Sequence, residues 1–159
     1  MPAADSIFLD LDETLIHTRE VDSQLEPGFP SPLRYGPYFA WLRPDAKEIL
    51  QIVDGLKVPL YICTASERAY AAGLSVAFGL GVPEANILGL EHLRAGRTGI
   101  SPNSVLIDDL DPGHEIARLK RQVLEIGTER YFQIPAFRGF PNPHRLRTLR
   151  ALKAILGRA

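Results

Sequence analysis

The sequence predicts an α/β protein whose parallel sheet is covered by helices on both faces. Short apolar runs that contain β-branched and aromatic residues alternate along the chain with segments of helical periodicity. Polar residues, Gly or Pro bound each run, as is typical of strands. Two carboxylates, Asp10 and Asp12, follow the first run directly. In open sheets of this class, ligands bind at the carboxyl ends of the strands.

Five short segments have the composition of strands, and four have the spacing of helices. The strand candidates are residues 6–11, 58–64, 86–90, 105–108 and 131–134. Pro44 opens the first helix candidate at the favoured first-turn position, and Gly55 ends it. The other helix candidates are residues 67–78, residues 112–127 with Asp111 as the expected N-cap, and a segment that carries Leu146, Leu149, Leu152 and Leu156.

The composition is that of a globular protein with one domain, residues 1–159. Hydrophobic residues make up 45% of the chain and charged residues 23%. No apolar run approaches the roughly 20 residues that span a bilayer, and the N-terminus lacks the basic flank of a signal peptide. We therefore expect a cytoplasmic protein without membrane contact. Cys63 is the single cysteine and lies in an apolar run, which indicates a buried thiol.

Positive charge gathers at the end of the chain. Residues 138–159 contain five Arg and one Lys but no Asp or Glu. This basic tail is either the solvated face of a terminal helix or a surface that attracts phosphate-bearing partners, nucleic acid among them.

Asp10, Asp12 and Thr14 stand at alternate positions at the end of the first apolar run. Alternation directs all three side chains to one side of an extended backbone. Two carboxylates held so close repel each other unless a cation lies beside them. The spacing therefore suggests a divalent metal, a nucleophile and an acid/base group in one place.

Four stretches in order resemble the haloacid dehalogenase (HAD) superfamily of phosphatases, and more narrowly its FCP/SCP-like small-CTD-phosphatase, or NLI-interacting-factor-like, branch. They are residues 10–15 (DLDETL), 41–44 (WLRP), 61–71 (YICTASERAYA) and 105–109 (VLIDD). The resemblance implies a three-layer Rossmann-like fold without a cap domain, in which the Asp10 strand lies in the middle of about five strands.

Residues 17–40 interrupt the alternation of strands and helices. Six Pro and Gly residues make a continuous helix there unfavourable, while four aromatic residues supply apolar mass. In the superfamily this position corresponds to a flap over the site, and such a short flap implies an open site that suits large substrates. A packed surface loop is the alternative.

The resemblance also implies roles for the first motif. Asp10 would attack phosphorus and become an aspartyl phosphate. Asp12 would protonate the leaving group and then deprotonate the attacking water. In the family, the second Asp contributes its backbone carbonyl to the metal, so Asp10 and Asp12 both count as metal ligands. Thr14 would fix the turn by hydrogen bonding.

Thr64 and Ala65 follow the second strand, where a hydroxyl and backbone N–H groups can hold a phosphate oxygen. Ser66 is then the N-cap of the next helix. The alternative makes Thr64 the cap, because residues 64–67 fit the capping box.

Asp108 and Asp109 end the fourth strand, beside the first in the implied order. Buried carboxylates need a cation, and Mg²⁺ takes oxygen ligands. In the resembling branch the second residue of this pair is an Asn that binds metal. Asp109 stands there in this chain, so either Asp could be the direct ligand.

The third motif of the superfamily, a lysine that neutralises phosphate and nucleophile, has no counterpart between Lys57 and Lys120. Arg94 and Arg97 precede the Asp108 strand at about the right distance, and arginine can hold a phosphate bidentately. Either arginine is a candidate for this cation. The alternative is that it is only a charged residue of a loop.

The expected function is hydrolysis of a phosphomonoester by a Mg²⁺-dependent, HAD-type phosphatase. The resemblance favours phosphoserine or phosphothreonine segments of proteins as substrates. Nucleic-acid 3′-phosphate ends are the first alternative because of the basic tail, and a small metabolite is the second. A non-catalytic interaction module with this fold is the rival hypothesis, which the absent motif-three lysine favours.

Overall fold

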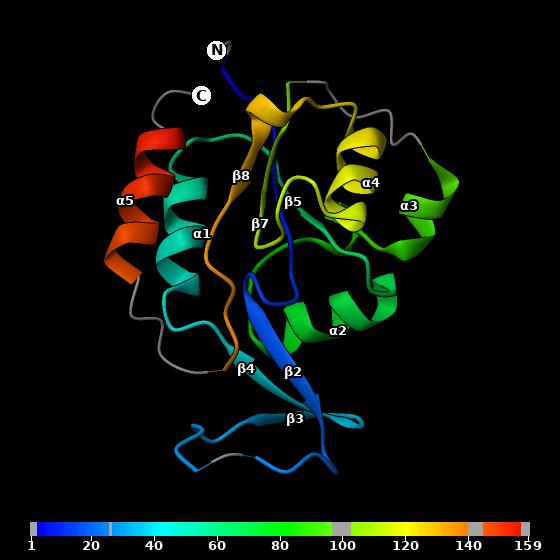
Figure 1. Cartoon of the computed structure of the whole chain (residues 1–159), viewed down its shortest axis with the longest axis vertical. Helices are drawn as coiled ribbons and strands as arrows, with labels where there is room; N and C mark the ends of the chain where they lie inside the picture. The colour runs from blue at the N-terminus through cyan, green and yellow to red at the C-terminus, as the bar shows by residue number, and fades with distance from the viewer. Residues whose placement is uncertain (1–2, 26, 97–102, 140–144, 157–159) are drawn as a thin grey trace.

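The strand that leads to Asp10 lies in the middle of a five-stranded parallel sheet (Figure 1). The computed structural model describes residues 3–25, 27–96, 103–139 and 145–156. In spatial order, the strands are β6 (Ile87–Leu88), β5 (Leu60–Cys63), β1 (Ile7–Leu9), β7 (Val105–Asp108) and β8 (Tyr131–Gln133). Neighbours pair in parallel. The five predicted strands and the central place of the first are confirmed.

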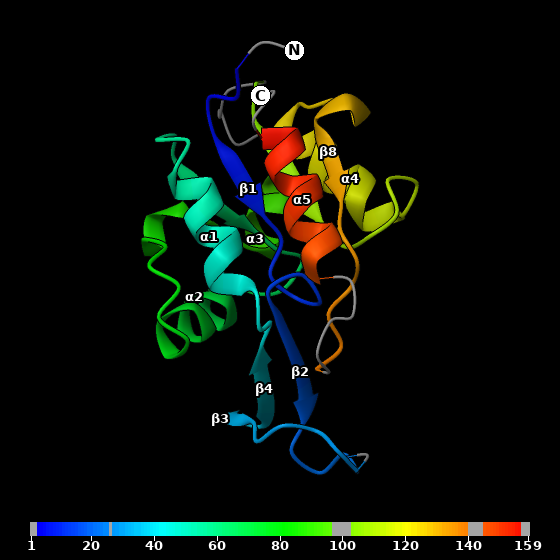
Figure 2. The same cartoon turned by 90° about the vertical axis from the view of Figure 1, so that its left-hand side faces the viewer.

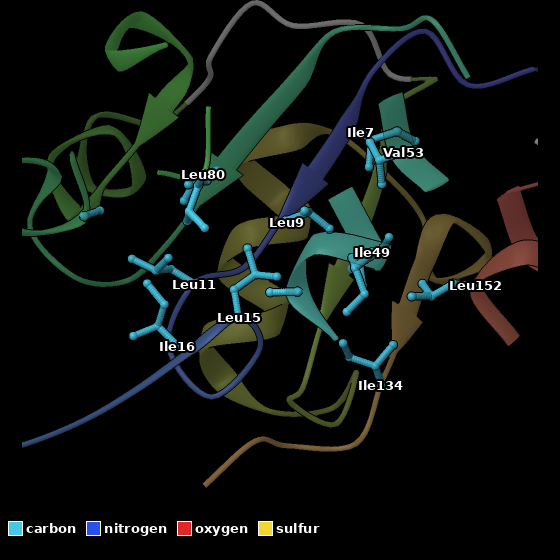
Figure 3. Packing of buried hydrophobic residues seen from close by; sticks show 14 of the residues in the cluster. Ile7, Leu9, Leu11, Leu15, Ile16, Ile49, Val53, Leu80, Ile134 and Leu152 are labelled. Atoms are coloured by element: carbon cyan, nitrogen blue, oxygen red, sulfur yellow. The ribbon is translucent and has the colours of Figure 1, made fainter. Parts of the chain in front are cut away.

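Alternate residues of β1 point to opposite faces of this sheet, and each face has its own apolar cluster. Ile7 and Leu9 pack in a cluster with residues of α1 (Ala46–Asp54), α2 (Arg68–Ala77) and α5 (Arg145–Leu156), part of which Figure 3 shows. Phe8 packs in the other cluster with residues of α3 (Leu90–Ala95) and α4 (Glu115–Leu124). The predicted three-layer α/β architecture is therefore confirmed.

Two helix starts differ from the sequence expectation. The helix expected to open at Pro44 begins at Ala46, with Asp45 as its N-cap. The helix expected from Pro112 begins at Glu115, because the residues before it form a hydrogen-bonded turn. Asp111, the expected N-cap, accepts a hydrogen bond from the N–H of Gly113 inside that turn. His114 is the N-cap instead, and its Nδ1 accepts from the N–H of Ile116. The short helix α3 and the 3₁₀ turns Glu84–Asn86 and Thr128–Arg130 were not predicted.

A second, antiparallel sheet fills much of the segment that interrupts the alternation. It consists of β2 (Ile16–Glu20), β3 (Leu33–Tyr35) and β4 (Tyr38–Leu42) in the order β2-β4-β3. A two-residue turn joins β3 to β4, and its Gly36 has a φ of 55°, which suits glycine. Figures 1 and 2 show this sheet extending beyond the end of β1 that leads to Asp10.

Arg43 joins the second sheet to the first. Its side chain is fully buried, and its Nη1 donates to the backbone carbonyls of Thr14 at 3.1 Å and Pro135 at 2.9 Å. Its Nε lies 2.8 Å from the carboxylate of Asp45. The charge of this buried guanidinium is thus paired, and three separate loops are tied together.

Within the described parts of the chain, we find no helix that combines the length and the apolar character needed to cross a membrane.

Candidate active site

A tight turn follows β1 and brings Thr14 back to Asp10. The carbonyl of Leu11 accepts hydrogen bonds from the N–H groups of Thr14, Leu15 and Ile16, and Glu13 adopts a left-handed φ of 64°. The hydroxyl of Thr14 lies 2.9 Å from Oδ2 of Asp10 and 3.2 Å from Oδ1 of Asp109, so its single proton is shared between two acceptors.

Three carboxylates meet where β1 and β7 end side by side. Asp10, Asp108 and Asp109 each place a carboxylate oxygen within 4.8 Å of the others. Asp10 and Asp108 are buried, whereas Asp109 is partly accessible. The structure therefore brings together three of the four predicted metal ligands through their side chains.

Lys120 is the cation that contacts this cluster, and the sequence interpretation missed it. Its Nζ lies 2.7 Å from Oδ1 of Asp10 and 2.7 Å from Oδ2 of Asp108, and the side chain is 1% exposed. It extends from α4, on the buried face that also carries Ala117 and Val123. A lysine in an apolar stripe just after the Asp108-Asp109 pair was the signal that could have revealed it.

The electrostatics of the cluster show more negative charge than Lys120 can balance. Burial raises the pKa of Asp10 to about 8, with Lys120 opposing the rise and Asp108 adding to it. Burial and the adjacent Asp108 raise the pKa of Asp109 to about 6. Burial lowers the pKa of Lys120, but Asp10 and Asp108 outweigh it and the net shift is upward, so the ammonium group stays charged.

Asp12 points into a different environment, made of hydroxyl groups. Its Oδ2 accepts from Ser66 Oγ at 2.7 Å and from Thr64 Oγ1 at 3.3 Å. Its Oδ1 accepts from the hydroxyl of Tyr70 at 3.1 Å. Among the described residues, the group of carboxylates that could share a metal does not include the Asp12 side chain. The two aspartates of the first motif thus have separate surroundings.

Neither capping interpretation of residues 64–67 matches the structure. The N-cap of α2 is Glu67, and its side chain makes no cap hydrogen bond. Thr64 Oγ1 accepts instead from the N–H of Ser66 at 3.1 Å, while the hydroxyl of Ser66 donates to Asp12. Thr64 and Ser66 therefore both belong to the surroundings of Asp12.

A hollow of about 510 Å³ opens beside Asp12. Ala65, one of the predicted phosphate-binding residues, lines it, and so does Glu67. The complete lining is Asp12, Thr18, Tyr38, Ala65, Ser66, Glu67, Tyr70 and Leu90. The hollow therefore lies between the second sheet and the start of α2, beside Asp12, and its lining residues carry no basic side chain.

Arg94 does not supply the cation of the cluster. Arg94 lies on α3 with its side chain exposed, and Arg97 falls outside the described residues. Lys120 takes the place expected for Arg94 beside Asp10. Lys120 follows β7 in the chain, whereas both predicted arginines precede it.

Cys63 and His17 are both buried. Cys63 is fully buried in β5, and burial raises the pKa of its thiol to about 12, which rules out an activated cysteine nucleophile. His17 is 7% exposed, and its ring contacts the rings of Trp41 and Phe137. Its Nδ1 lies 2.6 Å from the carboxylate of Glu13.

Comparisons with known proteins agree with this architecture. Residues 6–77 match the family model of NLI interacting factor-like phosphatases. No curated protein sequence matches the chain significantly. A variant of the fission yeast RNA polymerase II CTD phosphatase Fcp1 bound to beryllium fluoride is 18% identical, with a TM-score of 0.53 over 97% of this chain and 51% of that one.

A second similar structure is that of Fcp1 described as an essential RNA polymerase II CTD phosphatase. It is 19% identical, with a TM-score of 0.55 over 95% of this chain and 50% of that one. The chain spans about half the length of both structures, and the likeness shows a shared fold. The family match over residues 6–77 confirms the resemblance predicted from the sequence.

Proposed function

We propose that this chain hydrolyses phosphomonoesters through an aspartyl phosphate on Asp10 with the help of Mg²⁺. The proposal starts from the match of residues 6–77 to the family model of NLI interacting factor-like phosphatases. The observation that carries the proposal is the contact of Lys120 with Asp10 at 2.7 Å. The absence of a motif-three lysine was the main argument for a non-catalytic module, and Lys120 provides the cation that this motif was expected to supply. We further propose one domain over residues 1–159 without a cap.

The reaction proceeds in two displacements. In the first, a carboxylate oxygen of Asp10 bonds to phosphorus while the bond from phosphorus to the ester oxygen breaks, and Asp12 gives that oxygen a proton. In the second, Asp12 takes a proton from water, the water oxygen bonds to phosphorus, and the bond to Asp10 breaks. Lys120 balances charge beside the phosphoryl group, and Thr64 with the N–H of Ala65 binds its oxygens.

The donor set fits Mg²⁺. Three carboxylates share one ammonium group, which leaves negative charge that a hard, oxygen-binding cation would neutralise. Asp10, Asp109 and the backbone carbonyl of Asp12 would hold the ion, with Asp108 beside them. Asp109 is the more accessible residue of the pair, and Asp108 is already engaged by Lys120 and by the N–H of Leu110. Bound there, Mg²⁺ supplies positive charge next to the transferring phosphoryl group.

We propose phosphoserine or phosphothreonine segments of proteins as the substrate class. The hollow beside Asp12 carries the charges of Asp12 and Glu67, and no basic residue lines it. Such a surface accepts a neutral or basic peptide more readily than a polyanionic nucleic acid. The second sheet, with β2 and β4 beside this hollow, would act as the flap over the site.

Turnover of para-nitrophenyl phosphate, with and without Mg²⁺, tests the proposed reaction. A panel of phosphopeptides, 3′-phosphorylated oligonucleotides and phosphorylated metabolites then tests the substrate class. Metal-dependent release of phosphate by the unaltered protein but not by Asp10→Asn is the expected result. The absence of turnover in a folded, Mg²⁺-loaded protein would establish the non-catalytic alternative.

A further inference from the structure

A chain of hydroxyl groups leads from the second sheet to Asp12. Tyr70, on α2, donates to Oδ1 of Asp12 at 3.1 Å. Thr18, on β2, places its Oγ1 2.9 Å from the same phenolic oxygen. A phenol has a single proton, and Tyr70 gives it to Asp12, so Thr18 must be the donor in the bond between them. The chain therefore runs in one direction, from Thr18 through Tyr70 to Asp12.

We propose that Tyr70 and Thr18 are positioning residues that orient Asp12 for proton transfer to the leaving group. This inference rests on the proposed function. Ser66 and Thr64 hold only Oδ2, and a carboxylate held at one oxygen can still turn about that contact. The bond from Tyr70 to Oδ1 fixes the plane of the group. It also keeps the carboxylate on the side of the hollow, away from the three-carboxylate cluster.

The ring of Tyr70 is itself fixed by the second sheet. It makes edge-on contacts with the rings of Tyr38 and Tyr35, whose centroids lie 5.6 and 6.3 Å from its own. Tyr38, Tyr35 and Thr18 come from β4, β3 and β2. Each strand of the antiparallel sheet thus supplies one side chain that holds Tyr70, and the sheet determines where the proton donor of the reaction points.

The dependence of rate on the leaving group tests this role. Para-nitrophenolate departs without protonation, whereas phenolate needs a proton as its bond breaks, and kcat/KM reports that first displacement. Tyr70→Phe should therefore lower kcat/KM for phenyl phosphate about tenfold, but for para-nitrophenyl phosphate less than about threefold. Thr18→Val should show the same selectivity with a smaller loss. In an Asp12→Asn background, Tyr70→Phe should add no further selectivity.

Tyr61→Phe is the matched control, because it removes a phenolic hydroxyl from a tyrosine of β5 that stacks on Phe8 and takes no part in holding Tyr70 or Asp12. It should leave both substrates unaffected, and thermal unfolding of each variant should establish that it is folded. Equal losses on the two substrates, or none on either, would overturn the positioning role while the proposed function stands. If the unaltered protein has no phosphatase activity with Mg²⁺, the proposed function fails and this inference fails with it.

Discussion

The ammonium group of Lys120 lies 2.7 Å from Asp10, although 110 positions separate the two residues in the chain. It is equally close to Asp108, on the neighbouring strand. A lysine that is 1% exposed is stable only if its charge is paired, and here two buried carboxylates pair it. One side chain thereby joins α4 to the carboxyl ends of β1 and β7.

Replacing Lys120 should remove most of the catalytic power. Lys120→Met keeps much of the apolar stem but leaves Asp10, Asp108 and phosphate without their cation, so kcat should fall by about 10² to 10³-fold. Steady-state turnover of para-nitrophenyl phosphate measures this, with circular dichroism to verify folding. Arg94→Ala, at an exposed position, is the control and should retain its rate. If Arg94→Ala lowers kcat severely and Lys120→Met lowers it only mildly, the cation of the site is Arg94 on α3 and not Lys120 on α4.

Asp10→Asn should abolish turnover while the protein remains folded, because the amide is nearly isosteric but a poor nucleophile. Acid quenching of the unaltered enzyme with labelled substrate should trap a phosphorylated protein, and the variant should trap none. Asp111→Asn alters a carboxylate in an exposed turn and should behave as the unaltered enzyme does. Near-normal rates in folded Asp10→Asn would exclude the covalent mechanism.

Mg²⁺ binding should weaken as the pH falls from 8 to 5. Burial and Asp108 raise the pKa of Asp109 to about 6, so protons compete with the metal for this carboxylate below that pH. The affinity for Mg²⁺ decreases as the pH falls because only the ionised carboxylate binds the cation. Titrations that monitor the rise of the unfolding temperature with added Mg²⁺ at several pH values measure the effect. Asp109→Asn should bind Mg²⁺ more weakly at pH 8 and lose part of the pH dependence between 8 and 5, whereas Asp111→Asn should preserve it.

Cys63 should resist thiol reagents in the native protein. The side chain is fully buried, and burial raises the pKa of its thiol to about 12, so both access and thiolate are lacking. A coloured disulfide reagent should react with one thiol per chain in denaturant and negligibly without it. Rapid modification of the native protein, accompanied by loss of turnover, would contradict the structural role assigned to Cys63.

The parallel sheet could be predicted because its strands are short apolar runs between Gly, Pro and polar residues. The antiparallel sheet could not. Its strands are only three to five residues long and partly exposed, and the Pro and Gly residues between them suggested irregular structure. Pairing across that sheet depends on contacts that local propensity does not encode.

The candidate site divides in the same way. Asp10, Asp108 and Asp109 stand at the ends of neighbouring strands, so their clustering followed from the strand order that the resemblance implied. Lys120 lies in the second turn of a helix, and its partners become apparent only when that helix is packed on the sheet. The local pattern predicts Ser66 as a helix cap, but the helix begins one residue later, with Glu67 at the N-cap, and the hydroxyl of Ser66 donates to Asp12.

The hydrogen bond between Arg43 and Thr14 affects how the segment between these two residues can vary in evolution. The chain leaves the turn after β1 at Thr14 and returns at Arg43, whose Nη1 donates a hydrogen bond to the carbonyl of Thr14. The two ends of the segment from Thr14 to Arg43 are therefore hydrogen-bonded to each other, independently of what lies between them. Hairpins of other lengths and sequences can be inserted between these two points without moving Asp10. Evolution, or a protein engineer, can exchange that module to change which molecules are recognised, provided that the replacement keeps the contacts that Thr18, Tyr35 and Tyr38 make with Tyr70.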